Sequence, residues 1–398
     1  MNPIGSPTNF PQGFANGLSV RGMPLLQMQP GQVFYVGNGP TLNPNQHAGS
    51  NSNRGTYLDP FATLHYGLNT ACVPGRGDIV FVLPGHAETI SDATTLLFQC
   101  SGATVIGLGA GSLRPTFTFD TATAANIPVA GANMSVQNCL FRANFLSIAS
   151  TFTGVSSTST GVIAASGVIT ISALTGTIYP GATVTGTGVA LNTVILSQLT
   201  GTTGAAGTYQ TNATAAVAST TVITNYKDFA IDNCEFRDLS SSLSFLVVFT
   251  NSGTANAGDG FTFTRNSVFG LGTVSVTCAV VTAVSEDRVS LMDNLVISPT
   301  TAVTEGAVLL ATGAGDMTNV SIGRNRLVRP GVSTTIPGGI STSATAWTGL
   351  VYDNYDGLGL SGATGTFIST GSKVSLFNNY AMVTRAADKS ALINPAAV

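Results

Sequence analysis

The chain is short of charge: only 8% of its 398 residues are Asp, Glu, Lys or Arg, and the net charge is −3. No basic run occurs, which argues against nucleic-acid binding because that binding depends on neutralising phosphates. No stretch of about twenty apolar residues predicts a membrane span, and the N-terminus lacks the charged and apolar segments of a secretory signal. We expect a surface with so few charges to be covered largely by other protein.

Cysteine is also scarce and shows no metal-binding spacing. The five residues are Cys72, Cys100, Cys139, Cys234 and Cys278. None of them form a CxxC pair, and an odd number of cysteines cannot all be joined in disulfides within one chain. Without an export signal, free thiols in a reducing compartment are expected. Cys139 and Cys234 occupy equivalent places in a repeat described next, so we interpret them as small core residues. The sequence therefore predicts neither a metal site nor a cofactor.

What the chain does contain is a repeated line of strand-forming residues. The line 134–139 returns six more times, and its copies end at Cys234, Asn266, Asn294, Asn325, Asn354 and Asn379. The residue three positions before each end is apolar in every copy, and from Cys234 onward the ends lie 32, 28, 31, 29 and 25 residues apart. Apolar and polar residues that alternate with a period of two, within segments that repeat about every thirty residues, are typical of a β-solenoid. These periods predict eight to ten coils.

The last residue of each copy, called column zero here, is mostly asparagine. Asn tolerates the left-handed turn that ends a solenoid strand, and stacked amides hydrogen-bond from coil to coil. We therefore assign a structural ladder to Asn266, Asn294, Asn325, Asn354 and Asn379.

The column just before it alternates in charge over four coils: Arg265, Asp293, Arg324 and Asp353. Strands of stacked coils lie about 4.8 Å apart, so neighbours in this column are within salt-bridge range. A glycan-cleaving site is the alternative, since Asp293 and Asp353 would lie about 10 Å apart and such sites use two carboxylates. The intervening arginines would lower the carboxylate pKa and impair a general acid. We favour a structural ladder.

Residues 1–56 are rich in Pro, Gly and Asn and carry Arg21 and Arg54 as their only charges, with apolar clusters at 18–20, 24–26 and 33–36. A disordered linker is usually more polar. An extended arm that binds neighbouring subunits through these clusters fits better.

Asp59 and Pro60 then suit the N-cap and first position of a short helix, with Phe61, Leu64, His65 and Leu68 on one face. We expect this helix to cover the open first coil. The segments 59–64, 77–85 and 105–109 together resemble the opening of pectate-lyase-like right-handed parallel β-helices. The resemblance extends over about 56–150 and 225–385. It implies the fold, whereas both enzymes and inert spikes share this opening.

No charged residue occurs between Arg142 and Lys227, and columns 139 and 234 lie 95 residues apart. If one coil of about thirty residues is subtracted from this interval, an insertion of about sixty-five residues remains. Its Thr/Val runs and Gly turns predict a small β module, with a low-complexity loop as the alternative. The module resembles small β modules of tailed-phage virion proteins.

From these features we expect five segments: an extended arm at 1–56, the cap and first coils at 57–150, the uncharged β module at 151–224, further coils at 225–385, and a tail at 386–398 that covers the last coil or reaches a neighbour.

Catalytic residues of the resembling enzymes are not recognisable. Polygalacturonases need clustered Asp residues and a following His, yet His47, His65 and His86 all precede the repeat. Pectate lyases need several carboxylates around Ca²⁺ with a basic partner, and no matching motif occurs. Aromatic candidates for stacking on sugars are Trp347, Tyr352, Tyr355 and Tyr380, with the alternative that Tyr355 and Tyr380, which share a column, simply pack together. We predict that the chain is not an enzyme.

The arm motif 9–16 (NFPQGFAN) also resembles sequence segments of phage structural proteins. We therefore expect a bacteriophage virion protein, assembled in the host cytoplasm. The favoured role is a capsid cement or decoration protein, a homotrimer whose arm binds the major capsid protein or other virion proteins. The alternative is a tailspike or fibre that binds, or also cleaves, a host surface glycan. A secreted polysaccharide lyase is the third candidate, and the missing signal and site residues argue against it.

Overall fold

The computed structural model describes only part of the chain. The described ranges are 19–20, 23–24, 31–41, 43–119, 124–144, 151–239, 245–251, 258–270, 277–283, 286–297, 307–312, 317–329, 340–341, 348–358, 368–369, 374–382 and 390–393.

The molecule is built around three parallel sheets wound from one chain, so the predicted all-β, single-stranded parallel β-helix is confirmed. The first sheet has ten strands, which agrees with eight to ten coils. In order along the stack they are β3 (Val33–Val36), β4 (Ile79–Val82), β6 (Thr104–Gly107), β9 (Ser135–Gln137), β18 (Ala230–Asp232), β21 (Thr262–Thr264), β25 (Ser290–Met292), β29 (Val320–Gly323), β32 (Gly349–Tyr352) and β35 (Val374–Phe377).

The second and third sheets complete each coil. The second consists of β5 (Ala87–Thr89), β7 (Thr116–Phe119), β10 (Leu140–Ala143), β19 (Glu235–Asp238), β22 (Ser267–Phe269), β26 (Leu295–Ile297), β30 (Arg326–Arg329), β33 (Tyr355–Leu358), β36 (Asn379–Met382) and the antiparallel β37 (Ser390–Ile393). The third consists of β8 (Ile127–Val129), β11 (Phe152–Gly154), β20 (Phe245–Asn251), β23 (Thr277–Ala283), β27 (Ala307–Thr312), β31 (Ile340–Ser341) and β34 (Ile368–Ser369). Two short pairs, β1 (Ser19–Val20) with β2 (Met23–Pro24) and β24 (Glu286–Asp287) with β28 (Met317–Thr318), lie outside these sheets.

The interior is a stack of apolar side chains, one set per coil. The repeat's apolar column lies inside the first sheet, where Val136, Ile231, Phe263, Leu291, Ile322 and Val351 are all fully buried. Beside it, the rings of Phe117, Phe141 and Phe236 stack at centroid distances of 5.5 and 5.0 Å. Burial of such side chains is the main stabilising contribution in a solenoid that has no central globular core.

The turn between the first and second sheets differs from the prediction. The left-handed residue is not the column-zero asparagine but the residue before it: φ is 47° to 59° at Asn138, Asn233, Arg265, Asp293, Arg324, Asp353 and Asn378. The bend at that residue directs its side chain outward and leaves the next side chain inside. Arginine gains nothing from this conformation, but the Arg324 backbone N–H is held by the carbonyl of Tyr352 in the next coil at 3.1 Å.

A second left-handed corner precedes the first sheet, six residues before column zero. It contains Asn133, Asp228, Gly260, Arg288 and Asn319, with φ between 54° and 74°. The backbone N–H of each of the first four donates to a carbonyl of the following coil at 2.7 to 2.9 Å. The two corners therefore fix the register of the first sheet at both of its ends.

The N-terminal cap also begins later than predicted. Thr63, not Asp59, is the N-cap, and its side chain accepts a hydrogen bond from the Tyr66 amide. The helix α1 (Leu64–Tyr66) continues as the wider turn η2 (Gly67–Ala71), and Leu64 and Leu68 are fully buried. A further one-turn helix, η3 (Gly111–Leu113), lies in the corner after β6. The solenoid itself starts earlier than the expected arm boundary at 56, because β3 pairs with β4 in the first sheet.

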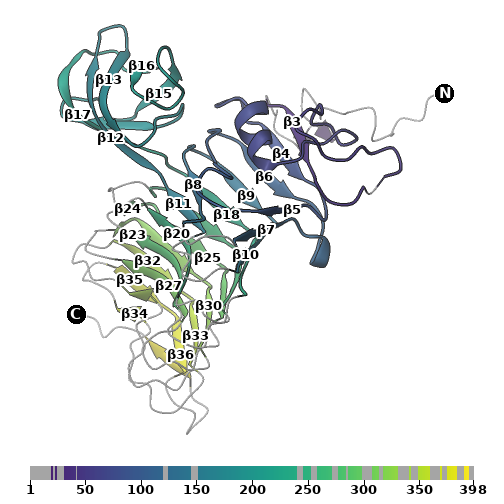
Figure 1. The fold of residues 1–398 in the computed structure, drawn as a ribbon. Helices are drawn as coiled ribbons and strands as arrows, with labels where there is room; N and C mark the ends of the chain where they lie inside the picture. Colours follow the sequence, from purple (N-terminus) through teal and green to yellow (C-terminus); the bar gives the residue numbers. More distant parts are fainter. Residues whose placement is uncertain are drawn as a thin grey trace.

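The inserted module is a closed, six-stranded antiparallel barrel (Figure 1). Its strands are β12 (Ser156–Ile163), β13 (Val168–Thr175), β14 (Thr183–Gly186), β15 (Thr193–Gln198), β16 (Gly207–Thr211) and β17 (Val217–Asn225). Figure 1 shows it projecting from the side of the coil stack between β11 and β18. The coil register continues past it, since Ser135 of β9 still pairs with Ala230 of β18.

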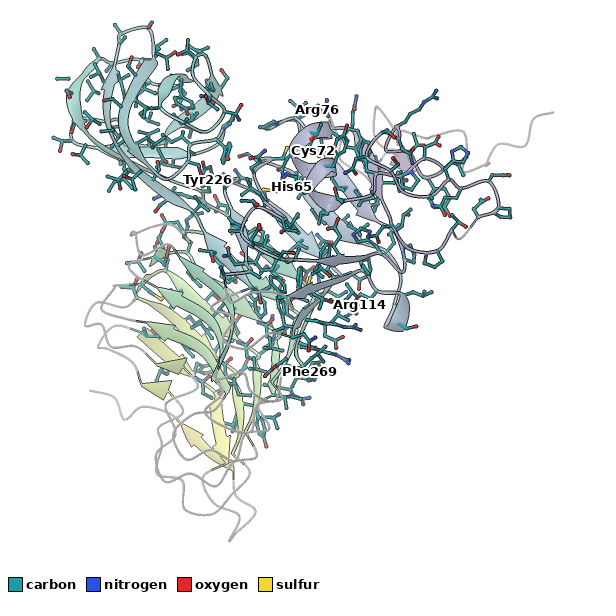
Figure 2. The ribbon with its side chains drawn as sticks, viewed as in Figure 1. His65, Cys72, Arg76, Arg114, Tyr226 and Phe269 are labelled. Atoms are coloured by element: carbon teal, nitrogen blue, oxygen red, sulfur yellow. The ribbon has the colours of Figure 1, made fainter. Side chains whose placement is uncertain are left out.

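The barrel is docked on the coils through specific contacts at its base. The Ser101 hydroxyl donates to the Pro180 carbonyl at 2.6 Å, and the backbone N–H of Tyr179 donates to the Tyr226 hydroxyl at 2.7 Å. Ala130 of the coils belongs to the barrel's own buried cluster, and Figure 2 places Tyr226 at the foot of the barrel. Because Gly181 has no side chain, Ser101 fits against it. The two parts thus form a packed junction.

Four cysteines, at 72, 100, 139 and 234, are buried and unbridged, while Cys278 has no described side chain. The Cys139 backbone N–H approaches the Cys234 sulfur at 3.4 Å, as stacked core residues would. Among the described residues, none of the helices is both long and apolar enough to span a bilayer.

Candidate functional site

The column-zero asparagines form a continuous ladder inside the stack. Along Asn266, Asn294, Asn325, Asn354 and Asn379, each side-chain Nδ2 donates to the Oδ1 of the next at 2.9 to 3.3 Å. Each backbone N–H donates to the same oxygen at 2.9 to 3.1 Å. All five residues are buried to 1% exposure or less. Their amides are thereby used within the fold, which fits a structural role and leaves them inaccessible to a ligand.

The charged column outside it forms fewer pairs than the alternating sequence predicts. Asp293 and Arg324 form the expected bidentate pair, with both N–O distances 2.7 Å. Arg265 instead contacts Asp232 of the preceding coil, through Nε at 2.8 Å and also through Nη2. Asp353 is exposed and has no ion pair among the described residues. Strand pairing places Asp232 opposite Thr264, the residue before Arg265. The Asp232 carboxylate is therefore closer to Arg265 than is the carboxylate of Asp293, the predicted partner.

This column is electrostatically unsuited to general acid catalysis. The hydrogen bonds from Arg324 hold the pKa of Asp293 below its usual value, and the charges of Arg324 and Arg265 act in the same direction. A glycosidic acid needs the opposite, a carboxyl group whose pKa is raised enough to stay protonated. The pair therefore acts as a cross-coil clamp.

An aromatic surface lies next to this clamp on the outer face of the first sheet. The ring of Tyr352 passes over Gly323, where an added Cβ would lie 2.5 Å from the ring. Its hydroxyl approaches the Met292 sulfur at 3.7 Å, and the Arg324 guanidinium carbon lies 5.8 Å from the ring centroid. We call Asp293, Arg324 and Tyr352 the outer platform. A flat ring flanked by planar charged groups offers both stacking and hydrogen bonds to a ligand.

A cleft at the junction of barrel and coils is the second candidate site. Its volume is about 570 Å³, within the range of ligand pockets. The coil side is formed by corner residues, among them Gly75, Gly102 and Asn133, and the barrel side by β14 and β15 with Val194 and Leu196. The coil side of the cleft therefore consists largely of small residues, whereas its barrel side combines apolar residues with Thr183 and Asn192.

One end of this cleft is charged. Lys227 pairs with Asp259 at 2.7 Å, while Arg288 bridges Asp228 and Asp287 at 3.2 Å each. Gly260 lies between the coils of Asp228 and Arg288, and a Cβ there would collide with the Asp228 carboxylate. The negative charge of Asp228 raises the pKa of Arg288, which stays protonated.

Sequence reasoning missed Lys227, Asp228 and Arg288 as a group. Arg288 follows Asp228 by sixty residues in the sequence, so only the winding of the coils brings it next to Lys227 and Asp228. The sequence does contain a signal for this group, because Asp228 and Arg288 both stand six residues before column zero.

The histidines are dispersed over the first coils. His47 contacts Asp59 near the surface, and His86 is buried and accepts a hydrogen bond from the Asn38 amide at 3.1 Å. In the part of the chain that the structure describes, His, Cys, Asp and Glu side chains do not gather in groups of three or more suited to a metal.

Comparison with known proteins leaves the family open. No protein-family model matches the sequence. No curated protein matches it either. A solved rhamnogalacturonan lyase is similar at 11% identity and a TM-score of 0.35, over 92% of this chain and 90% of that one. The Gp54 tailspike of Acinetobacter baumannii bacteriophage AP22, solved in complex with A. baumannii capsular saccharide, is similar at 10% identity and a TM-score of 0.16, over 78% and 73%. Similarity at these TM-scores assigns no function, and the β-helix is established by the chain's own strand pairing.

Proposed function

We propose that this chain is a structural protein of a bacteriophage virion, a cement or decoration protein of the capsid. In this role the coil stack is a rigid body, and the segments that leave it make the contacts. Residues 1–30 would bind the major capsid protein, and three copies would assemble around a local symmetry axis. The resemblance of segment 9–16 and of the inserted module to phage structural proteins supports this assignment.

The observation that carries the proposal is the way the described charges are used. The clamp Asp293–Arg324 and the pair Arg265–Asp232 tie neighbouring coils together, and the pair Arg288–Asp228 spans two coil steps. In the described part of the chain, the pKa values of Asp78, Asp92, Asp287 and Asp293 lie below the ordinary value, because hydrogen bonds to these carboxylates outweigh the effect of burial. This pattern suits a scaffold that must resist deformation better than it suits an acid–base catalyst.

The barrel offers a second contact surface. Its sequence has no charged residue, and Leu191, Leu196 and Leu199 are 94%, 54% and 52% exposed. Exposed leucines on a surface without charges favour protein contact, because neither repulsion nor charge desolvation opposes association.

Reconstruction of the intact phage particle tests the proposal. We expect density for the coil stack and barrel on the head surface, with the N-terminal segment lying across capsid subunits. A chain lacking residues 1–30 should fail to bind heads in a sedimentation assay, whereas a barrel-less chain should still bind. Density for this chain only at the tail would refute the capsid role.

The alternative, a tailspike or fibre that binds host surface glycan, is favoured by the outer platform. Tyr352 supplies a ring face, and Arg324 and Asp293 supply planar hydrogen-bonding groups beside it. Incubation of the purified chain with host polysaccharide tests this role. Retention of the chain by the polysaccharide, lost in Tyr352→Ala, would support it, and release of new reducing ends would add cleavage.

A further inference from the structure

Two buried cysteines, Cys72 and Cys100, lie where the N-terminal cap meets the coil stack. Cys72 is the C-cap of η2, and its backbone N–H donates to the Gly67 carbonyl at 3.1 Å; Figure 2 labels it at the cap. Cys100 stands in the turn before β6, where its carbonyl accepts from the Ala103 N–H at 3.1 Å. Both side chains belong to the main core cluster, with 8% and 2% of their surface exposed. Each cysteine is therefore carried by backbone that is fixed by its own hydrogen bonds.

Hydrogen bonds on both sides of the cysteines hold their two segments together. The Asn69 Nδ2 donates to the Leu97 carbonyl at 2.9 Å, and each of these residues stands three positions before a cysteine. Beyond the cysteines, the Gly75 N–H donates to the Ser101 carbonyl at 2.8 Å. The two thiols thus lie between two contacts that join the cap to the same coil segment.

The thiols themselves are in contact. A hydrogen bond with the Cys100 thiol raises the pKa of Cys72, and burial acts in the same direction. The segment after Cys72 is also held, because the Val73 N–H and the Arg76 side chain bind Asp78 at 2.8 and 2.6 Å. Val73 is 47% exposed, so the pair lies just below the surface. Thiols in contact on closely apposed segments are what a disulfide requires.

A second buried pair, Cys139 and Cys234, differs in the direction of its thiols. The Cys139 thiol donates to the Gln137 carbonyl at 3.5 Å, and the Cys234 thiol donates to the Val136 carbonyl at 3.7 Å. Both side chains are 2% exposed or less. These thiols point to carbonyls of the first sheet, deep in the coil interior, and the pair serves as an internal reference for the cysteines at the cap.

We propose that Cys72 and Cys100 form a disulfide when the folded protein meets a low-molecular-weight disulfide. The Cys72 thiolate attacks one sulfur of the reagent, whose S–S bond breaks and releases one thiol. The Cys100 thiolate then attacks the Cys72 sulfur, forms the bond between the cysteines and releases the second thiol. The two protein sulfurs lose two electrons to the reagent, and their two protons end on the released thiols.

The bond closes a loop over 72–100 that contains β4 and β5 and ties the cap to the coil of β4. A cross-link of this length stabilises a fold mainly by restricting the unfolded chain. Because the thiolate is the nucleophile, the raised pKa of Cys72 makes closure slow at neutral pH. The protein therefore folds with free thiols and acquires the bond later, in an oxidising medium. This modification goes beyond the proposed function and does not depend on it.

Oxidation of the full-length protein by hydroxyethyl disulfide, a small reagent of this class, tests the proposal. After incubation of the folded protein at about pH 8, the remaining thiols are alkylated in denaturant and the intact mass is measured. We expect one disulfide per chain, and fragmentation of the non-reduced peptides should assign it to Cys72 and Cys100. Absence of a disulfide in the folded protein, or a disulfide between other cysteines, would overturn the proposal.

Variants of single cysteines distinguish a paired site from general thiol reactivity. Cys139→Ala and Cys278→Ala should form the disulfide at the native rate. Cys100→Ala should stop at the mixed disulfide between Cys72 and the reagent, because the second step needs the Cys100 thiol. Full closure of a protein disulfide in Cys100→Ala would contradict the assignment.

Hydrogen exchange measures what the bond does to the fold. In the oxidised protein, amides of α1, η2 and β4 should exchange about thirtyfold more slowly than in the reduced protein, with the barrel strands unchanged. Reduction by dithiothreitol should restore the original rates. Equal exchange in both forms would mean that the bond does not tie the cap to the coil. None of these outcomes bears on the particle reconstruction, so the capsid role and the disulfide fail or succeed separately.

Discussion

The coil stack and the barrel achieve order by different means. In the first two sheets of the coils, strands of only three or four residues are held by stacked apolar side chains, an asparagine ladder and charge pairs that link one coil to the next. In the barrel, strands reach eight or nine residues, the sheet closes on itself, and no charged side chain takes part. A solenoid coil depends on its neighbours for stability, whereas a closed barrel has its own core and no free edge.

This difference explains how the barrel was accommodated. Ser156 at its start pairs with Asn225 at its end, so the insertion leaves and rejoins the coil at one place. The coils on either side keep their register, and Cys139 stacks on Cys234 across the 95-residue interval. An insertion at a corner therefore leaves the repeated interior unchanged.

The largest expected effect separates the two cores. Phe236→Ala removes a ring that stacks on Phe141 at 5.0 Å in the coil interior, and we expect a loss of about 3–5 kcal/mol in the free energy of unfolding. Hydrogen exchange followed by mass spectrometry should show faster exchange in the neighbouring coils β10, β19 and β22, with the barrel strands unchanged. Equal acceleration in the barrel would mean that coil and barrel unfold as one cooperative unit.

The asparagine ladder should be next in size. Asn294→Ala leaves the buried amide of Asn266 without its acceptor and removes the donor to Phe263, so we expect a loss of about 1–3 kcal/mol. The control is Asn212→Ala in the barrel, whose amide bonds are solvent-exposed and whose loss should stay near 0.5 kcal/mol. Chemical denaturation of both variants measures the difference. Similar losses would argue against a special role for the ladder.

Removal of the barrel should have a smaller effect on the coils. Replacing residues 156–225 by a short Gly-Ser turn joins two adjacent chain ends, so the coil stack should remain folded. The contacts that Ser101 and Tyr226 make with the barrel would be lost, and exchange should increase only around those residues. Circular dichroism and hydrogen exchange on the shortened protein check this outcome. A shortened chain that fails to fold would show that the coils require the barrel.

The smallest effect is a difference in acid sensitivity. Burial opposes ionisation of Asp78, but hydrogen bonds from Arg76 and from the Val73 and Gln32 amides outweigh it and hold its pKa below the ordinary value. A carboxyl group of this kind stabilises the fold above its unfolded pKa of about 3.9, and the contribution is lost as pH falls through the lower folded value. The barrel has no carboxyl group.

Hydrogen exchange at pH 5 and at pH 3, corrected for the intrinsic rate, should therefore show loosening around β3 and β4 but not in the barrel. Asp78→Asn should remove much of the pH dependence at β3. Loosening of the barrel to the same extent would contradict the assignment of acid sensitivity to this carboxyl group.

Several features of the fold could be predicted because they recur. The period near thirty, the inward apolar residue and the column of asparagines each appear in many copies. A chance match to the pattern in one copy therefore has little influence on the prediction. The inserted module could be predicted because no charged residue occurs between Arg142 and Lys227. The predicted helix start is wrong because Asp59 and Pro60 form a good local N-terminal signal. The helix begins after Thr63 instead, where the first helical amide, that of Leu64, donates a hydrogen bond to the Glu88 side chain at 2.9 Å.

The candidate sites were less predictable. Arg265 binds Asp232 because a long side chain selects among neighbours on two coils, and spacing along the sequence does not rank them. The outer platform depends on the absence of a side chain at Gly323 as much as on Tyr352. The junction cleft depends on where the barrel is docked.

The sequence by itself determined the coil, its period, its inner residues and the presence of a separate uncharged module, because these are local patterns repeated along the chain. Only the tertiary structure decided which charges meet, which residue bends at each corner, and that barrel and coils enclose a cleft beside Asp228 and Arg288. These depend on side-chain reach and on contacts between residues tens of positions apart, which the winding of the coils brings together.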